Sequence, residues 1–219
     1  GNEKPPEKAR NALWHKTNKA TQRMDKLSYA LGLSMGNNFL SSGIKELHYE
    51  DFAAGVKAVY EGTEKQMSFD EAKKIINEYF TRLESEAAEA NKKAGEAFLA
   101  GNAKRAGVKV TASGLQYEII AEGEGKCPEA KDSVTVHYTG TLIDGRVFDS
   151  SVQRGEPATF GVTQVIPAWV EALQMMKPGA KWRIYCPSQI AYGPNGAGGL
   201  IGPNETLIFD IELITVNRN

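Results

Sequence analysis

The spacing of apolar residues changes near Gly107, and the predicted secondary structure changes with it. Before that point, apolar and small residues recur at intervals of three and four, the spacing of one face of a helix. After it, apolar residues alternate with polar ones, the pattern of a half-buried strand. The sequence therefore predicts a helical first half and a second half built from strands.

Three helices are predicted in the first half. The first carries a repeat of small and apolar residues at Leu27, Ala30, Leu31, Ser34 and Met35. A second, short helix ends near Gly62. A third extends from about 69 to about 100, since Ser68 and Glu71 form a capping box, and at 1.5 Å per residue it is about 45 Å long. Its later part is rich in alanine and charged residues, so we expect a solvated strut that Gly95 weakens locally.

Gly32 and Gly36 lie one turn apart on the first helix, and two interpretations remain open. They are tolerated within a helix buried in the protein, or they let another helix approach closely, from this chain or a second subunit. Three helices over roughly 80 residues make a thin core, which favours burial of their apolar faces against a second copy. We therefore expect a homodimer formed through residues 23–80.

The second half predicts an antiparallel sheet covered by one helix. Apolar residues alternate over two long segments, at Val134, Val136 and Tyr138 and at Leu207, Phe209, Ile211 and Leu213. Asp144-Gly145 predicts a hairpin turn. Pro167 to Met176 predicts one short helix, closed by Lys177-Pro178-Gly179. A helical segment followed by a sheet with one helix is an α+β arrangement.

Composition and charge exclude several classes of function. A formal net charge of -1 argues against nucleic-acid binding through bulk electrostatics. Cys127 and Cys186 are too far apart for a CxxC site, and the three histidines lack the HExxH spacing, so no metal site is predicted. The glycine-rich stretch 193–202 lacks the GxGxxG register of a nucleotide loop. No cofactor is expected.

Four motifs of the second half occur in a recognisable order. VTVHYTGTLIDGRVFDSS (134–151) is followed by VIPAWVEALQMMKPGAKWRIYCP (165–187), AYG (191–193) and ETLIFDIELITV (205–216). In this order and spacing, they closely resemble the FKBP-type peptidyl-prolyl cis-trans isomerases from Gly114 to the C-terminus. The resemblance implies an FKBP-like antiparallel sheet wrapped on one short helix, and an enzyme that rotates X-Pro bonds without a cofactor or covalent intermediate.

The resemblance also implies a pocket for the prolyl ring. Catalytic roles fall on Tyr138, Phe148, Asp149, Trp169, Tyr192 and Phe209. Substrate-binding roles fall on Phe160, Val165, Ile166 and Ile201. Trp169 would form the floor, while the Tyr192 hydroxyl and the backbone N–H of Ile166 would orient the rotating carbonyl. Asp149 would fix the polar rim of the pocket rather than transfer a proton.

The first half resembles the helical module of bacterial envelope isomerases, the macrophage infectivity potentiator group. The residues are SYALGLSMGNNF (28–39), EDFAAGVKAVYEG (50–62) and the long helix leading into SGLQYEII (113–120). This implies a flexible tether over 1–22, a helical dimerisation domain over 23–110 and an isomerase domain over 111–219. It also implies a periplasmic or outer-membrane-attached protein, with a possible lipid anchor upstream of the tether.

Three functional hypotheses follow from these observations. The first is a dimeric isomerase that acts on proline-containing unfolded or partly folded exported polypeptides, with macrolide-type inhibitors implied by the family. The second is a module that docks proline-containing partners without useful turnover. The third is a chaperone whose helical arms hold unfolded chains. Every apolar pocket position carries a suitable residue, which counts against lost turnover.

Overall fold

The computed structural model describes Lys8 and residues 23–219. The predicted tether over 1–22 lies outside the described residues, apart from Lys8. The chain divides into two compact units, residues 1–69 and 70–219. Most of the long helix belongs to the second unit.

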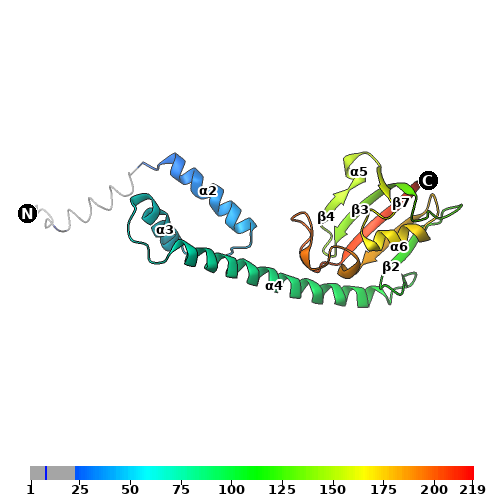
Figure 1. Ribbon diagram of the computed structural model, residues 1–219, viewed down its shortest axis with the longest axis horizontal. Coiled ribbons are helices and arrows are strands. Elements are labelled where there is room, and N and C mark those ends of the chain that lie inside the picture. The colour runs from blue at the N-terminus through cyan, green and yellow to red at the C-terminus, as the bar shows by residue number, and fades with distance from the viewer. Residues whose placement is uncertain (1–7, 9–22) are drawn as a thin grey trace, which may run out of the picture. The chain divides into compact units, whose positions relative to one another are not determined.

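The N-terminal unit contains two helices, α2 (Lys26–Ser41) and α3 (Tyr49–Glu61) (Figure 1). The rings of Phe39 and Phe52 meet edge to face, with centroids 5.5 Å apart, and link the two helices. Gly62 ends α3 in the left-handed conformation, with φ 63°, which glycine adopts without a steric penalty. Neither helix has a buried residue. The unit therefore lacks a core of its own within the described chain.

The C-terminal unit is a seven-stranded antiparallel sheet with a helix packed on it, which confirms the predicted α+β class (Figure 1). The strand order is β1-β2-β6-β7-β3-β4, and β5 pairs with β3. The strands are β1 (Lys109–Val110), β2 (Gln116–Ala121), β3 (Ser133–Leu142), β4 (Val147–Ser150), β5 (Ala158–Gly161), β6 (Lys181–Cys186) and β7 (Leu207–Asn217). The short helices are α5 (Ser151–Arg154), α6 (Pro167–Met175), η1 (Ser188–Ile190) and η2 (Gly193–Asn195).

Alternation along β3 and β7 directs one set of side chains into the core. Every second residue of β3 is buried, from Val134 to Leu142, and β7 follows the same pattern from Leu207 to Leu213. The helix α6 covers this face with Ala168, Trp169, Ala172 and Leu173, all buried. The core therefore lies between α6 and the two long strands.

The sequence had suggested that the later part of the long helix α4 (Phe69–Asn102) is solvated, but the structure buries one face of that part. Gly95 and Asn102 are buried, while Ala88, Asn91, Phe98 and Leu99 are partly buried. These positions recur every three or four residues, so they share one face of the helix. The correction is that this face packs on the sheet and on the segment before β7, within the same unit. The sequence hid this stripe because four of its six members, Ala88, Asn91, Gly95 and Asn102, are small or polar, although Phe98 and Leu99 are apolar.

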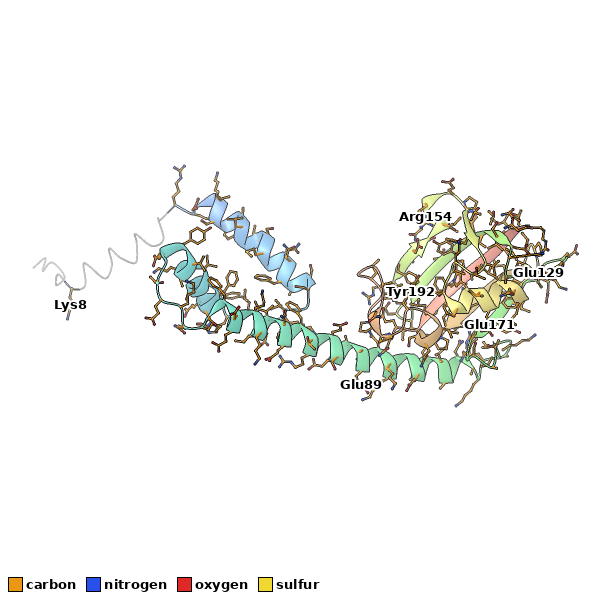
Figure 2. All side chains as sticks on the ribbon, viewed as in Figure 1. Lys8, Glu89, Glu129, Arg154, Glu171 and Tyr192 are labelled. Atoms are coloured by element: carbon orange, nitrogen blue, oxygen red, sulfur yellow. The ribbon has the colours of Figure 1, made fainter. Side chains whose placement is uncertain are left out.

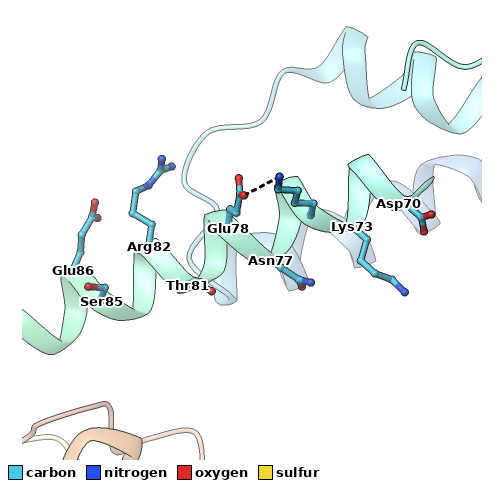
Figure 3. A pocket seen from close by; sticks show the side chains of 9 residues that line it. Asp70, Lys73, Asn77, Glu78, Thr81, Arg82, Ser85 and Glu86 are labelled. Atoms are coloured by element: carbon cyan, nitrogen blue, oxygen red, sulfur yellow. Dashed lines mark ion pairs between the residues drawn. The ribbon is translucent and has the colours of Figure 1, made fainter. Parts of the chain in front are cut away.

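The early part of α4, by contrast, has an exposed polar face, and this face borders an open hollow of about 670 Å³ (Figure 3). Only residues between Asp70 and Glu86 line it, all from this one helix. An exposed ion pair joins Lys74 and Glu78 at 4.0 Å. Because a single helix cannot enclose a ligand, this hollow is a solvated surface. Among the described residues, no helix combines the length and apolar character needed to cross a membrane.

Candidate active site

A second hollow of about 420 Å³ opens on the C-terminal unit beside α6. It is lined by Tyr138, Phe148, Asp149, Phe160, Gln164, Val165, Ile166, Trp169, Tyr192 and Phe209. Nine of these ten residues were named from the sequence. Gln164 was not. Ile201 was named but does not line the hollow; it is 9% exposed and belongs to the adjoining core.

Trp169 lies at the centre of the aromatic side chains. Pro167 occupies the first turn of α6, where its fixed φ favours the start of a helix, and this places Trp169 on the first turn. Tyr138, Phe160 and Phe209 each approach its ring edge to face, at centroid distances of 5.1, 5.7 and 5.3 Å. Such perpendicular contacts are favourable. They fix the four rings as apolar walls around the hollow.

The site depends on a glycine that the sequence did not single out. Gly140 follows Tyr138 on the inward face of β3, and it pairs with Phe209 on β7. A Cβ at this position would lie 2.5 Å from Phe148 Cζ and 2.8 Å from Phe209 Cε1. These two rings contact each other edge to face at 5.5 Å. The missing side chain therefore makes room for two walls of the hollow, which is one of the usual reasons for a glycine inside a strand.

A polar cluster closes one side of the hollow. The Tyr138 hydroxyl donates to Asp149 Oδ2 at 2.5 Å, and Arg154 pairs with the other carboxylate oxygen. Arg154 Nη2 also donates to the Tyr138 hydroxyl at 3.0 Å. The short helix α5 presents Arg154, and the Ser150 hydroxyl caps it by accepting from the N–H of Gln153 at 3.1 Å. Arg154 was not named from the sequence, although its four-residue distance from Ser150 is one helical turn.

The same cluster sets the charge of the site. Burial opposes ionisation of Asp149, but hydrogen bonds from Tyr138 and Arg154 outweigh it and hold the pKa of this carboxyl below its usual value. Burial and the bond to Asp149 raise the pKa of the Tyr138 hydroxyl. At neutral pH the rim therefore carries a carboxylate, a neutral phenol and a guanidinium.

The lowered pKa of Asp149 predicts how the site responds to acid. A carboxyl whose pKa is lower in the folded state contributes stability above its unfolded pKa, about 3.9, and loses it as the pH falls through the folded value. We expect this cluster to stay intact from about pH 5 upward, with an acid loss of isomerisation beginning only below about pH 4. Rates measured against pH for the wild type and for Asp149→Asn test this. The variant should lack the acid limb, and an identical limb in both proteins would contradict the assignment.

The backbone of Tyr138 is held from behind by Ser151. The Ser151 hydroxyl is fully buried, accepts from the Tyr138 N–H at 2.7 Å and lies 2.9 Å from His137 Nδ1. His137 thus lies on the face of β3 away from the hollow, and it contacts the same Ser151 hydroxyl that binds the Tyr138 backbone. The contact explains the position of this histidine without a catalytic role.

Of the hydrogen-bond donors at the hollow that have no partner among the described residues, two were named from the sequence. They are the Tyr192 hydroxyl and the backbone N–H of Ile166, the residue that precedes α6. Burial, with the Asp149 charge second, raises the pKa of Tyr192, so its hydroxyl keeps its proton at neutral pH. Figure 2 shows the positions of Tyr192 and Arg154 in the C-terminal unit. Both donors are free to bind a carbonyl oxygen.

A further donor without a partner belongs to Trp169, which also lines the hollow. Trp169 Nε1 is buried, and no hydrogen-bond partner for it occurs among the described residues. Within residues 23–219, no group of three or more His, Cys, Asp or Glu side chains is placed to hold a metal ion. The arrangement is an apolar slot with a polar rim, suited to binding and orienting a neutral group.

Comparison with known proteins shows the family of the chain. Residues 124–214 match the family described as FKBP-type peptidyl-prolyl cis-trans isomerase, and residues 24–119 match the domain amino terminal to such isomerases. The outer membrane protein MIP of Legionella longbeachae is 46% identical over 205 residues, covering 90% of this chain and 88% of that protein. The chain belongs to the FKBP-type peptidyl-prolyl cis-trans isomerases.

Other relatives agree with this membership. The FKBP-type 22 kDa peptidyl-prolyl cis-trans isomerase of Escherichia coli is 43% identical, covering 86% of this isomerase and 93% of that protein. The crystal structure of FkpA from Escherichia coli superposes with a TM-score of 0.69 at 35% identity, covering 90% of this isomerase and 98% of that chain. The similarity includes the helical half, so the family resemblance drawn from the sequence is confirmed for both halves.

Proposed function

We propose that the hollow beside α6 is where the isomerase holds and rotates an X-Pro bond. One observation carries the proposal: an aromatic slot formed by Tyr138, Phe160, Trp169 and Phe209 has two unpartnered donors at its edge. The slot suits a prolyl ring, and the donors suit the carbonyl that turns. By the same chemistry, the slot suits macrolide-type inhibitors.

The reaction itself explains why these residues are sufficient. An uncatalysed X-Pro bond crosses a barrier of about 20 kcal/mol and exchanges in tens to hundreds of seconds. Rotation breaks no bond, so it needs no nucleophile. An apolar slot disfavours the planar, strongly solvated amide, and donors placed for the twisted carbonyl stabilise the transition state more than the ground state. A million-fold acceleration requires about 8 kcal/mol in total.

Within this mechanism Asp149 shapes the rim. Its carboxylate accepts from Tyr138 and pairs with Arg154, and its lowered pKa keeps it ionised at neutral pH. An ionised carboxylate has no proton to donate to the amide nitrogen. Asp149 therefore acts by holding Tyr138 and by setting the charge beside Tyr192.

The test of the proposed site is isomerisation of a short proline-containing peptide by the intact protein. Tyr192→Phe removes one donor and leaves the ring in place, so we expect kcat/KM to fall about tenfold. Tyr117→Phe is the matched control, because Tyr117 stacks on Trp182 at 4.4 Å, outside the hollow. Equal rates for the wild type and Tyr192→Phe would reject Tyr192 as a donor. An inactive wild type that is folded would favour a proline-docking module or a chaperone.

We also propose that the isomerase is a homodimer formed through residues 23–80. The helix α2 exposes apolar side chains on every side, including Leu27 at 68%, Leu33 at 61% and Leu40 at 65%. A helix that is apolar all round is normally buried. A hollow of about 540 Å³ lies over Gly32 and Gly36, and nothing lies within 4 Å of the position of a Cβ on either glycine. A second copy that packs its helices there would cover these faces.

The proposed arrangement favours one of the two interpretations of the glycine pair. Gly32 and Gly36 do not belong to a helix buried within the described chain, because α2 has no buried residue. Close approach by a helix of the second subunit is the interpretation that the open space supports. The same surface would be available to unfolded chains only if the dimer came apart.

We further propose that the isomerase acts in the bacterial cell envelope on exported polypeptides. The support is the relative from Legionella longbeachae, which is named as an outer membrane protein. A periplasmic or outer-membrane-attached location would expose the site to chains that fold after export. Fractionation of cells that produce the protein from its natural gene tests this, and recovery in the cytoplasm alone would contradict it.

A further inference from the structure

The segment between β6 and β7 carries part of the proposed site. Tyr192, which lines the hollow, immediately precedes residues 193–206, which we call the rim loop. Inside this loop Ala197 and Ile201 pair through two backbone hydrogen bonds of 2.9 and 3.1 Å. The N–H of Asn204 donates to the Gly193 carbonyl at 2.9 Å. The loop therefore returns to its own start, directly behind Tyr192.

The end of the rim loop is hydrogen-bonded to the long helix α4. Asn91 Nδ2 donates to the Pro203 carbonyl at 3.0 Å, and Asn204 Nδ2 donates to the Ala88 carbonyl at 3.3 Å. Asn204 has a φ of 58°, and among the described residues it is the one non-glycine residue with a positive φ. A residue held in this conformation is normally constrained by its surroundings. Here the constraint includes a contact that crosses 116 residues of sequence.

Close to these hydrogen bonds, α4 and the end of the rim loop are also in direct contact. A Cβ on Gly95 would lie 2.4 Å from Thr206 Oγ1 and 3.3 Å from Thr206 Cβ. Thr206 is 4% exposed, and Gly95 is buried as well. The two segments meet at a distance that only glycine allows. Gly95 is therefore a site of close packing, whereas its place in a helix had suggested a weak point.

The same face of α4 continues onto the sheet. Gln116 Nε2 donates to the Leu99 carbonyl at 2.9 Å, and Asn102 Nδ2 donates to Gln116 Oε1 at 2.8 Å. Phe98 packs on Tyr185, with ring centroids 6.0 Å apart. In Figure 2 Glu89, a neighbour of this stripe in sequence, points away from the rim loop. This face of α4 therefore contacts the rim loop near Asn91 and the sheet near Asn102, and the contacts with the sheet hold the helix in place beside the rim loop.

We propose that Asn91, Gly95, Asn204 and Thr206 are positioning residues for catalysis. They hold the rim loop against α4, and the loop in turn holds the Tyr192 hydroxyl at the edge of the slot. The second half of the long helix is then part of the catalytic unit rather than only a connection to the dimerisation helices. This inference rests on the proposed function, since it assigns a task to residues that do not touch the substrate.

The test uses Gly95→Ala in the full-length protein, with Gly101→Ala as the matched control. Both replace a glycine of α4 by a better helix former, but nothing lies within 4 Å of the Cβ position at Gly101. Two quantities are measured for each: kcat/KM for a short proline-containing peptide, and amide hydrogen exchange of the rim loop relative to β3. We expect Gly95→Ala to lower kcat/KM about tenfold and to speed exchange in the rim loop alone, since small displacements of a site can cost this much. Gly101→Ala should match the wild type in both.

Two further variants separate positioning from a general loss of packing. Thr206→Ala added to Gly95→Ala removes the hydroxyl that the new methyl would meet, so we expect partial recovery of kcat/KM. Asn204→Gly keeps the left-handed backbone, which glycine tolerates, and removes only the bond to the Ala88 carbonyl. It should raise rim-loop exchange and lower kcat/KM while the midpoint of thermal unfolding changes little.

The outcomes distinguish this inference from the proposed function. Faster rim-loop exchange with a lower kcat/KM, recovered in the double variant, supports it. Faster exchange with an unchanged kcat/KM overturns it, because the loop would then be held without consequence for catalysis. Unchanged exchange in Gly95→Ala and Asn204→Gly also overturns it. If the wild type itself shows no turnover, it is the proposed function that fails first, and the inference falls with it.

Discussion

Gly140→Ala is expected to lower kcat/KM for a proline-containing peptide by about 10- to 100-fold, although the residue carries no functional group. The new Cβ would lie within 3 Å of both Phe148 and Phe209, which are walls of the proposed slot. Adding a methyl group to a packed site costs about 1–3 kcal/mol. Each 1.36 kcal/mol taken from transition-state binding is a factor of about ten in rate.

We expect the rings of Phe148 and Phe209 to move and relieve the strain that the new methyl group introduces. Backbone pairing fixes Gly140 between Phe209 on β7 and Asp149 on β4, so the strands cannot separate easily. The aromatic side chains would rotate instead, into the hollow that is proposed to receive the prolyl ring. We therefore expect the loss to fall mainly on the binding of substrate and transition state.

The measurement is peptide isomerisation beside thermal unfolding. Gly101→Ala is again the matched control, since it makes the same change in open space within the same unit. A Gly140→Ala protein that is folded and as active as this control would show that Phe148 and Phe209 do not form the slot. A variant that fails to fold can be replaced by Phe148→Ala, which deletes one wall and leaves Gly140 in place.

The sheet and the aromatic part of the site were predictable because each follows from a short-range pattern. Alternation from Val134 to Leu142 fixes which side chains of β3 enter the core, and it does so without knowledge of the partner strands. Four motifs in a fixed order then carry the family resemblance, and that resemblance predicts which residues line the hollow. Tyr138 and Trp169 are typical of this: their positions follow from strand and helix geometry together with the family resemblance.

The parts that could not be predicted depend on contacts across the fold. Gly140 and Gly95 look like ordinary glycines in a strand and a helix, and only the atoms opposite them show that a methyl group has no room. Arg154 reaches Asp149 because α5 turns the chain back over β4. Most residues on the buried face of α4 (Ala88, Asn91, Gly95 and Asn102) are small or polar and add little to the hydrophobic pattern, so that pattern assigned the later part of α4 to solvent.

The other large effect is expected on assembly. The wild type should have a molar mass of about twice 23.9 kDa by light scattering, and the double variant Gly32→Leu/Gly36→Leu should be a single chain of 23.9 kDa. The two new side chains would fill the hollow over α2 that a second copy is proposed to enter. A stable interface buries about 1,200–2,000 Å² in total, so exclusion of one helix removes much of it.

This substitution separates the interface from the stability of the helix. Leucine is a good helix former, whereas glycine is less favourable than alanine by roughly 0.8–1 kcal/mol per position, so α2 should become more helical. Loss of the dimer with unchanged or increased helicity by circular dichroism would therefore report the interface itself. Gly101→Leu is the control, because it adds the same side chain to α4, outside the proposed interface.

Isomerisation of a peptide and protection of an unfolded protein should then respond differently. The proposed slot lies wholly within residues 138–209, so the monomeric double variant should isomerise a short peptide at the wild-type rate. Protection of an aggregating unfolded protein is expected to change instead, since dissociation exposes the apolar faces of α2 and α3. A double variant that is still dimeric would place the subunit contact away from Gly32 and Gly36, and Leu31→Glu would then show whether α2 takes part in it at all.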